Sequence, residues 1–102
     1  MTKDPQITAA VKEILDLIKN ISPGKSVELR VPPYGAIQCV AGSNHRRGTP
    51  PNTVEMSGQT LIRLVKEPSL WITFCESGEV RASGLLSDLS NVLAQAAVKY
   101  RA

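Results

Sequence analysis

The chain has 102 residues, a hydrophobic content of 42% and a formal net charge of +3 at pH 7. This length and composition indicate a single globular domain over residues 1–102. The positive charge lacks the dense Lys/Arg stripe with interleaved aromatic residues that nucleic-acid binding requires, so we expect no nucleic-acid partner. No apolar run approaches the roughly 18 residues of a transmembrane segment and the N-terminus has no secretory pattern, so a cytoplasmic protein is expected.

The first third of the chain predicts a helix followed by a strand. Asp4 is a candidate N-cap, and Pro5 suits the first helical position. Apolar residues then recur at helical spacing until a stop at residues 22–24. The stripe consists of Ile7, Val11, Ile14, Leu15 and Ile18. Residues 26–31 alternate strictly between apolar and polar side chains, which predicts a half-buried strand.

Two further strands are expected around a long connection. Pro32 and Pro33 donate no backbone hydrogen bond, so the first strand must end in a turn there. Residues 34–40 are expected to return as its antiparallel partner and, being more apolar throughout, to be a central strand. Residues 53–56 then form a short strand.

The next segment predicts a helix and an ambiguous element. Ser57 is a candidate N-cap for a helix that reaches Val65 and ends before Pro68. The β-branched and aromatic residues within Leu70–Ser77 favour a strand by propensity. The flanking Ser69 and Gly78 instead suit the start and stop of a helix, and we predict a short helix here.

The last segment predicts a strand and a helix. Residues 79–83 are expected to form a strand that ends at Gly84, where the backbone approaches another element or φ becomes positive. A helix then begins at Ser87 or Asp88. Its expected apolar face consists of Leu86, Leu89, Val92, Leu93, Ala96 and Tyr100. The whole order predicts an α+β fold, with a small, mainly antiparallel or mixed sheet of four to five strands covered by helices.

The connection before residue 53 concentrates positive charge. It is longer than a hairpin needs and contains His45, Arg46 and Arg47. The planar donor forks of two arginines suit a phosphate, a carboxylate or a lipid headgroup. The alternative is a solvated loop whose arginines bond its own backbone carbonyls or Glu55.

Recognisable catalytic and metal-binding motifs are missing from the sequence. His45 has no Ser or Cys at a motif spacing, and Cys39 and Cys75 fit reduced, buried thiols. No cofactor motif is present, and no ligand set for a metal can be recognised. We therefore expect no enzyme, and a small enzyme that uses His45 is the least favoured alternative.

A second candidate site is apolar and lies between the sheet and the last helix. Its residues would either line a ligand tunnel or pack as an ordinary core, and the sequence leaves both readings open. They are Leu61, Leu64, Trp71, Phe74, Leu89, Val92 and Leu93.

Several segments resemble the bacterial branch of the sterol carrier protein family. They include SVELRVPPY at residues 26–34, HRRGTPPN at 45–52 and GEVRASG at 78–84. The resemblance covers roughly residues 22–90. It implies a sheet covered by helices, no catalytic residues, and an apolar tunnel that takes fatty acyl chains, acyl-coenzyme A or sterols.

We therefore expect the protein to bind or carry an apolar small molecule or lipid in a tunnel between the sheet and the C-terminal helix. A similar module occurs fused to enzymes of the mycothiol-dependent maleylpyruvate isomerase type. This implies an alternative, in which the chain is an accessory domain that docks a protein partner through the His45-Arg46-Arg47 loop.

Overall fold

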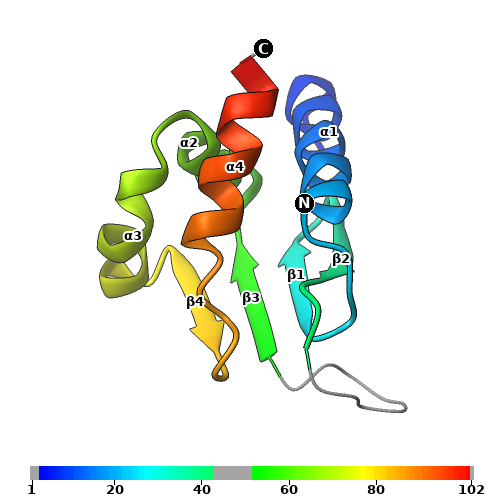
Figure 1. Cartoon of the computed structure of the whole chain (residues 1–102). Helices are drawn as coiled ribbons and strands as arrows, with labels where there is room; N and C mark the ends of the chain where they lie inside the picture. The colour runs from blue at the N-terminus through cyan, green and yellow to red at the C-terminus, as the bar shows by residue number, and fades with distance from the viewer. Residues whose placement is uncertain (1–2, 43–51, 102) are drawn as a thin grey trace.

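The computed structural model describes residues 3–42 and 52–101, with only the backbone described at Arg101. The elements are α1 (Pro5–Ile21), β1 (Val27–Val31), β2 (Gly35–Cys39), β3 (Asn52–Met56), α2 (Gly58–Lys66), η1 (Pro68–Leu70), α3 (Trp71–Ser77), β4 (Val80–Ser83) and α4 (Ser90–Arg101) (Figure 1). This succession agrees with the predicted order of helices and strands. Within the described residues, none of the helices has the length and apolar content that crossing a bilayer requires.

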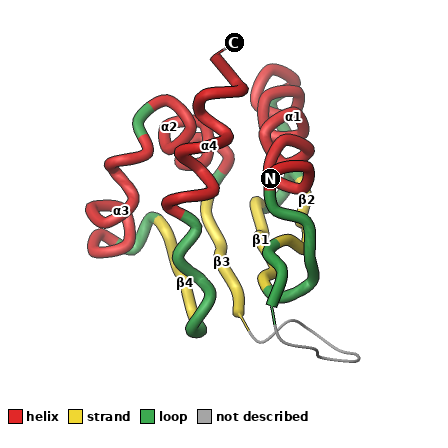
Figure 2. Tube along the Cα trace, in the orientation of Figure 1, coloured by secondary structure: helices red, strands yellow, loops and turns green. Residues whose placement is uncertain are grey.

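Four strands form one mixed sheet in the order β2-β1-β3-β4. β1 is antiparallel to β2 and parallel to β3, and β4 is antiparallel to β3. Every second residue of β1 and β3 is buried, because α1 and α4 cover one face of the sheet (Figures 1 and 2). The predicted α+β architecture with four to five strands is confirmed.

The place of β2 in the sheet differs from the prediction. We expected residues 34–40 to form a central strand, and β2 is an edge strand in which Cys39 alone is fully buried. Gly35 and Ala36 make the segment read as apolar, but they have little side chain to bury and are exposed. The central strands of this sheet are instead β1 and β3, in which buried residues alternate with partly exposed ones.

The ends of α1 follow the predicted signals. The Asp4 carboxylate accepts hydrogen bonds from the N–H groups of Gln6 and Ile7, at 2.8 and 3.4 Å, and Pro5 opens the helix. The interior of the predicted stripe is buried: Val11, Ile14, Leu15 and Ile18.

The ambiguous segment Leu70–Ser77 is helical. It runs from the end of η1 through α3, and Gly78 ends it in the left-handed conformation with φ of 86°. Trp71 and Phe74 are three residues apart, so the helical period places both on the buried side. A strand would have turned them to opposite faces.

The last helix begins at Ser90, two or three residues later than the predicted start at Asp88 or Ser87. Ser87 does not cap it, because its N–H and hydroxyl both donate to the Gly84 carbonyl, at 3.3 and 2.7 Å, and close a turn. The Asp88 carboxylate accepts from the N–H of Ser90, where α4 starts. Leu86 therefore lies in this turn, 40% exposed, and does not belong to the apolar face of α4.

The buried side chain of Asn52 holds three segments together. Its Nδ2 donates to the Ser26 carbonyl just before β1, at 2.8 Å, and its Oδ1 accepts from the Leu86 N–H after β4, at 3.0 Å. Gly84 lies against it with φ of 109°, and a Cβ there would overlap Asn52 Oδ1. The Gly84 prediction is therefore confirmed in both of its forms.

We expect Asn52→Ala to lower the free energy of unfolding by about 2–3 kcal/mol, since it leaves the Ser26 carbonyl and the Leu86 N–H without their described partner. Urea denaturation measures this difference. The control is Asn91→Ala, at an exposed position of α4, for which a change within about 0.5 kcal/mol is expected. Equal effects of the two substitutions would contradict the role assigned to Asn52.

Candidate functional site

The seven residues predicted to line an apolar pocket lie together beneath the helices. They come from α2, from α3, and from α4 with the residue that precedes it. Six are at most 6% exposed and belong to one continuous apolar core, and Val92 packs against that core half-buried. α4 closes this layer by contacting α1, α2 and η1.

These side chains belong to one continuous apolar core in this structure. Three hollows of 410–440 Å³ lie on the surface of the described residues, and other side chains line them. The helix-covered side of the sheet is thus packed as a core at Leu61, Leu64, Trp71, Phe74, Leu89, Val92 and Leu93. Their role in holding a ligand stays a prediction.

The predicted basic site falls outside the described residues. His45, Arg46 and Arg47 all belong to the segment 43–51. Glu55, which was considered as a partner for these arginines, is described, and it forms an ion pair with Arg81 at 2.6 Å.

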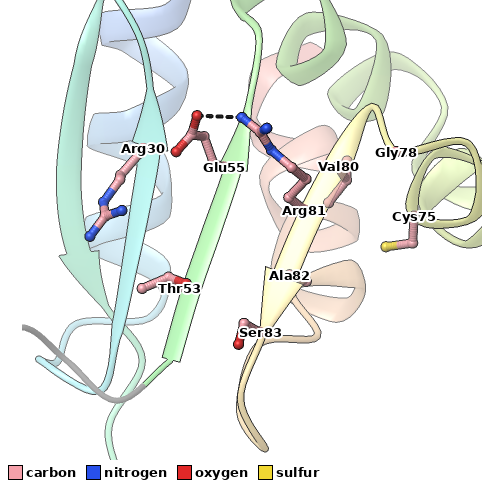
Figure 3. Close-up of a pocket in the computed structure, with 9 residues that line it drawn as sticks. All are labelled: Arg30, Thr53, Glu55, Cys75, Gly78, Val80, Arg81, Ala82 and Ser83. Atoms are coloured by element: carbon pink, nitrogen blue, oxygen red, sulfur yellow. Dashed lines mark hydrogen bonds and ion pairs between the residues drawn. The ribbon is translucent and has the colours of Figure 1, made fainter.

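The largest of the three hollows, 440 Å³, opens on the face of the sheet that the helices leave uncovered (Figure 3). It runs along β3 and β4 and is bounded on one side by the end of α3. Its lining is formed by Arg30, Thr53, Glu55, Cys75, Gly78, Val80, Arg81, Ala82 and Ser83. Its lining therefore combines charged and hydroxyl side chains with apolar ones.

Strand register explains how opposite charges meet on this face. Arg30 lies opposite Glu55 in the parallel pair β1–β3, and Glu55 lies opposite Arg81 in the antiparallel pair β3–β4. The Glu28 carboxylate bonds Arg30 at 3.0 Å, and this hydrogen bond and its charge raise the pKa of Arg30. Such exposed pairs contribute little to stability because solvent screens them. The hollow thus presents alternating, paired charges.

A second hollow of 430 Å³ continues from the first around the end of the sheet. The two share Glu55, Gly78 and Arg81, so the ion pair between Glu55 and Arg81 separates them. The second hollow is also bordered by the Pro32-Pro33 turn and by the start of α2. The third, of 410 Å³, lies on the outer side of α1.

Neither thiol is activated for nucleophilic chemistry. Burial raises the pKa of Cys39 to about 11. The pKa of Cys75 is raised by burial and, to a smaller degree, by the charges of Asp88 and Glu76. Because the thiolate is the nucleophile, raised pKa values keep both groups in the unreactive form at neutral pH. Among the described residues, no three His, Cys, Asp or Glu side chains are grouped so as to hold a metal ion.

Sequence reasoning did not find the hollows. It predicted that polar residues of the strands would alternate with buried ones, but it did not place β1 beside β3 in parallel. A search for opposite charges at outward positions of different predicted strands would have found Arg30, Glu55 and Arg81. It would not have given their order.

Comparison with known proteins gives a family match and a structural match. Residues 3–94 match the model of a family described as bacterial SCP ortholog. Among solved structures, one titled "UbiJ-SCP2 Ubiquinone synthesis protein" matches with a TM-score of 0.56 and 15% sequence identity, over 100% of this chain and 98% of that one. At this identity the likeness shows a common fold. A search of curated proteins found no match.

The buried thiol of Cys39 predicts a loss of stability at alkaline pH. Its folded-state pKa of about 11 lies above the unfolded value, so the folded protein binds the proton more tightly and stability falls as pH rises from about 9 to about 11. The loss is about 2–3 kcal/mol. Urea unfolding at several pH values measures it, and Cys39→Ala should remove this part of the pH dependence. Identical pH profiles for the two proteins would contradict the assignment.

Proposed function

The chain belongs to the bacterial SCP ortholog family, and we propose that it binds and carries an apolar small molecule of the lipid class without converting it. Fatty acyl chains, acyl-coenzyme A and sterol-like lipids are the ligand types that this proposal includes. The proposed site is the layer between the sheet and α4, formed by Leu61, Leu64, Trp71, Phe74, Leu89, Val92 and Leu93.

One observation carries this proposal: α4 covers the core through apolar contacts. The helix lies against α1, α2 and η1. The side chains that α4 and its preceding residue bury are Leu89, Leu93, Ala96 and Ala97. A guest that moves α4 outward therefore exchanges one apolar surface for another, which costs far less than separating buried polar partners. The two alanines also leave little volume to be displaced.

The expected affinity is modest. An acyl chain of about ten methylenes gains on the order of 8 kcal/mol on burial. Association, ordering of the acyl chain and displacement of α4 oppose this gain by several kcal/mol. The remainder corresponds to dissociation constants in the micromolar range or weaker.

The structural relative widens the choice of test ligands. The name of that protein refers to ubiquinone synthesis. We therefore include lipid-soluble quinones beside fatty acids and sterols in the binding experiments.

We also propose, as a second candidate function, that the chain docks a partner enzyme through His45, Arg46 and Arg47. The feature that supports it is the succession His45-Arg46-Arg47, which places two permanent positive charges and a titratable ring side by side in one connection. In this role the domain would be an accessory to the partner's activity.

We expect Leu93→Ala to tighten fatty-acid binding severalfold, because it opens space within the proposed site. The substitution should also cost about 2–5 kcal/mol of stability, part of which saturating ligand restores. The control is Leu15→Ala. Leu15 is also buried, on α1, and its Cδ1 lies near Gly35 of β2. Titration with a fluorescent fatty acid measures the affinities.

Native mass spectrometry of protein purified without detergent provides an independent test and should reveal bound lipid. Absence of bound lipid together with absence of displacement at high micromolar ligand would overturn the carrier proposal. Equal tightening by Leu93→Ala and Leu15→Ala would refute the location of the site.

For the docking role, we expect Arg46→Glu combined with Arg47→Glu to abolish binding of a protein partner while the fatty-acid titration stays unchanged. Lys12→Glu combined with Lys19→Glu makes the same change of charge at exposed positions of α1 and should leave the partner bound. Pull-down with the unmodified protein and the two double variants measures this. Loss of partner binding in both double variants would indicate a general effect of net charge.

A further inference from the structure

Within the described residues, one cation–π contact joins a charged side chain to the apolar residues of the proposed carrier site. Arg63 belongs to α2, and its guanidinium carbon lies 5.4 Å from the centre of the Phe74 ring on α3. The two helices follow each other through η1 (Figure 1). Phe74 is 5% exposed and is one of the seven site residues, whereas Arg63 is exposed. The positive charge therefore lies at the boundary between solvent and the apolar layer.

The pattern of burial along α2 explains this position. Leu64 and Val65, which directly follow Arg63, are buried in the core, so the helical period directs Arg63 to the outer side. The methylenes of a long arginine side chain can run along apolar surface while the guanidinium stays in water. Here the guanidinium comes to lie over the ring of Phe74.

The hydrogen-bond donors of this guanidinium are unused within the described part of the chain. No described carboxylate forms an ion pair with Arg63. This includes Glu67, one helical turn further on, whose backbone N–H donates to the Arg63 carbonyl at 2.8 Å. A guanidinium has five N–H donors in a planar fork that matches a carboxylate. Arg63 therefore offers an available donor set at the edge of Phe74.

We propose that Arg63 binds the carboxylate of a long-chain fatty acid whose alkyl chain enters the proposed carrier site past Phe74. Arg63 has this role only if the carrier function proposed above holds, and it selects an acid among the ligand types of that function over uncharged sterols and quinones. The carboxylate remains at the surface beside an exposed arginine, so the charge is not carried into the apolar layer. Only the alkyl chain is buried.

The test compares a fatty acid with the alcohol of the same chain length. The uncharged dye N-phenylnaphthylamine reports occupancy of the site, and dodecanoate or dodecanol is added as competitor at about pH 8, where the acid is ionised. We expect Arg63→Gln to weaken the binding of dodecanoate about tenfold, because a charge-assisted hydrogen bond is lost. Dodecanol should bind this variant as it binds the unmodified protein, which also shows that the apolar site is intact.

The control is Arg81→Gln. It makes the same substitution at an exposed arginine on the uncovered face of the sheet and removes the same charge. Both competitors should bind this variant as they bind the unmodified protein.

Three results would overturn the role of Arg63. They are unchanged binding of dodecanoate by Arg63→Gln, equal weakening of dodecanoate and dodecanol, or the same loss of dodecanoate binding in Arg81→Gln, which would indicate a general effect of net charge. In each of these cases the competitors still displace the dye from the unmodified protein, so the carrier proposal stands. If neither competitor displaces the dye from the unmodified protein, the carrier proposal fails and the role of Arg63 fails with it.

Discussion

The buried amide of Asn52 is the polar contact on which the arrangement of the sheet depends. β3 runs parallel to β1, although a long connection separates them in the chain, and Asn52 lies opposite Val27 in that pairing. By bonding the carbonyl just before β1 and the N–H just after β4, its side chain fixes where three strands meet. A parallel strand that slipped by one residue would expose Val54 and bury Glu55. The contact thus helps to decide which face of β3 is apolar.

The two faces of the sheet have different chemistry as a result. The helix-covered face is apolar and closed, with Leu29, Val54 and Leu93 fully buried. The uncovered face carries alternating charges that neutralise one another in pairs. A ligand rich in methylenes would suit the first face, whereas ion pairs span the strands of the second. The proposed carrier role therefore concentrates on the helices and in particular on α4.

Signals between near neighbours in the sequence predicted the helices and strands. Features that depend on contacts between distant segments were missed. Asp4 with Pro5, Ser57 and Gly78 marked helix ends correctly because each acts on its own neighbours. The edge position of β2 and the late start of α4 depend on contacts between distant segments, which a pattern along the chain does not contain. The seven apolar residues were expected together because helical periodicity shows which side chains face inward. Whether they enclose a void depends on how side chains of different helices fit, and no periodicity encodes that.

The sheet order also bears on how the protein avoids polymerising. Among the described residues, the outer strands β2 and β4 each pair with a neighbouring strand on one side only, and such edges can attract another chain. β4 has only four residues and α3 packs beside it, so a foreign strand finds little room. β2 has five residues, most of them small or polar, and offers little apolar surface to an incoming strand. The helices cover only one face of the sheet. The short, small-residue edge strands nevertheless limit the growth of cross-β fibrils from either edge.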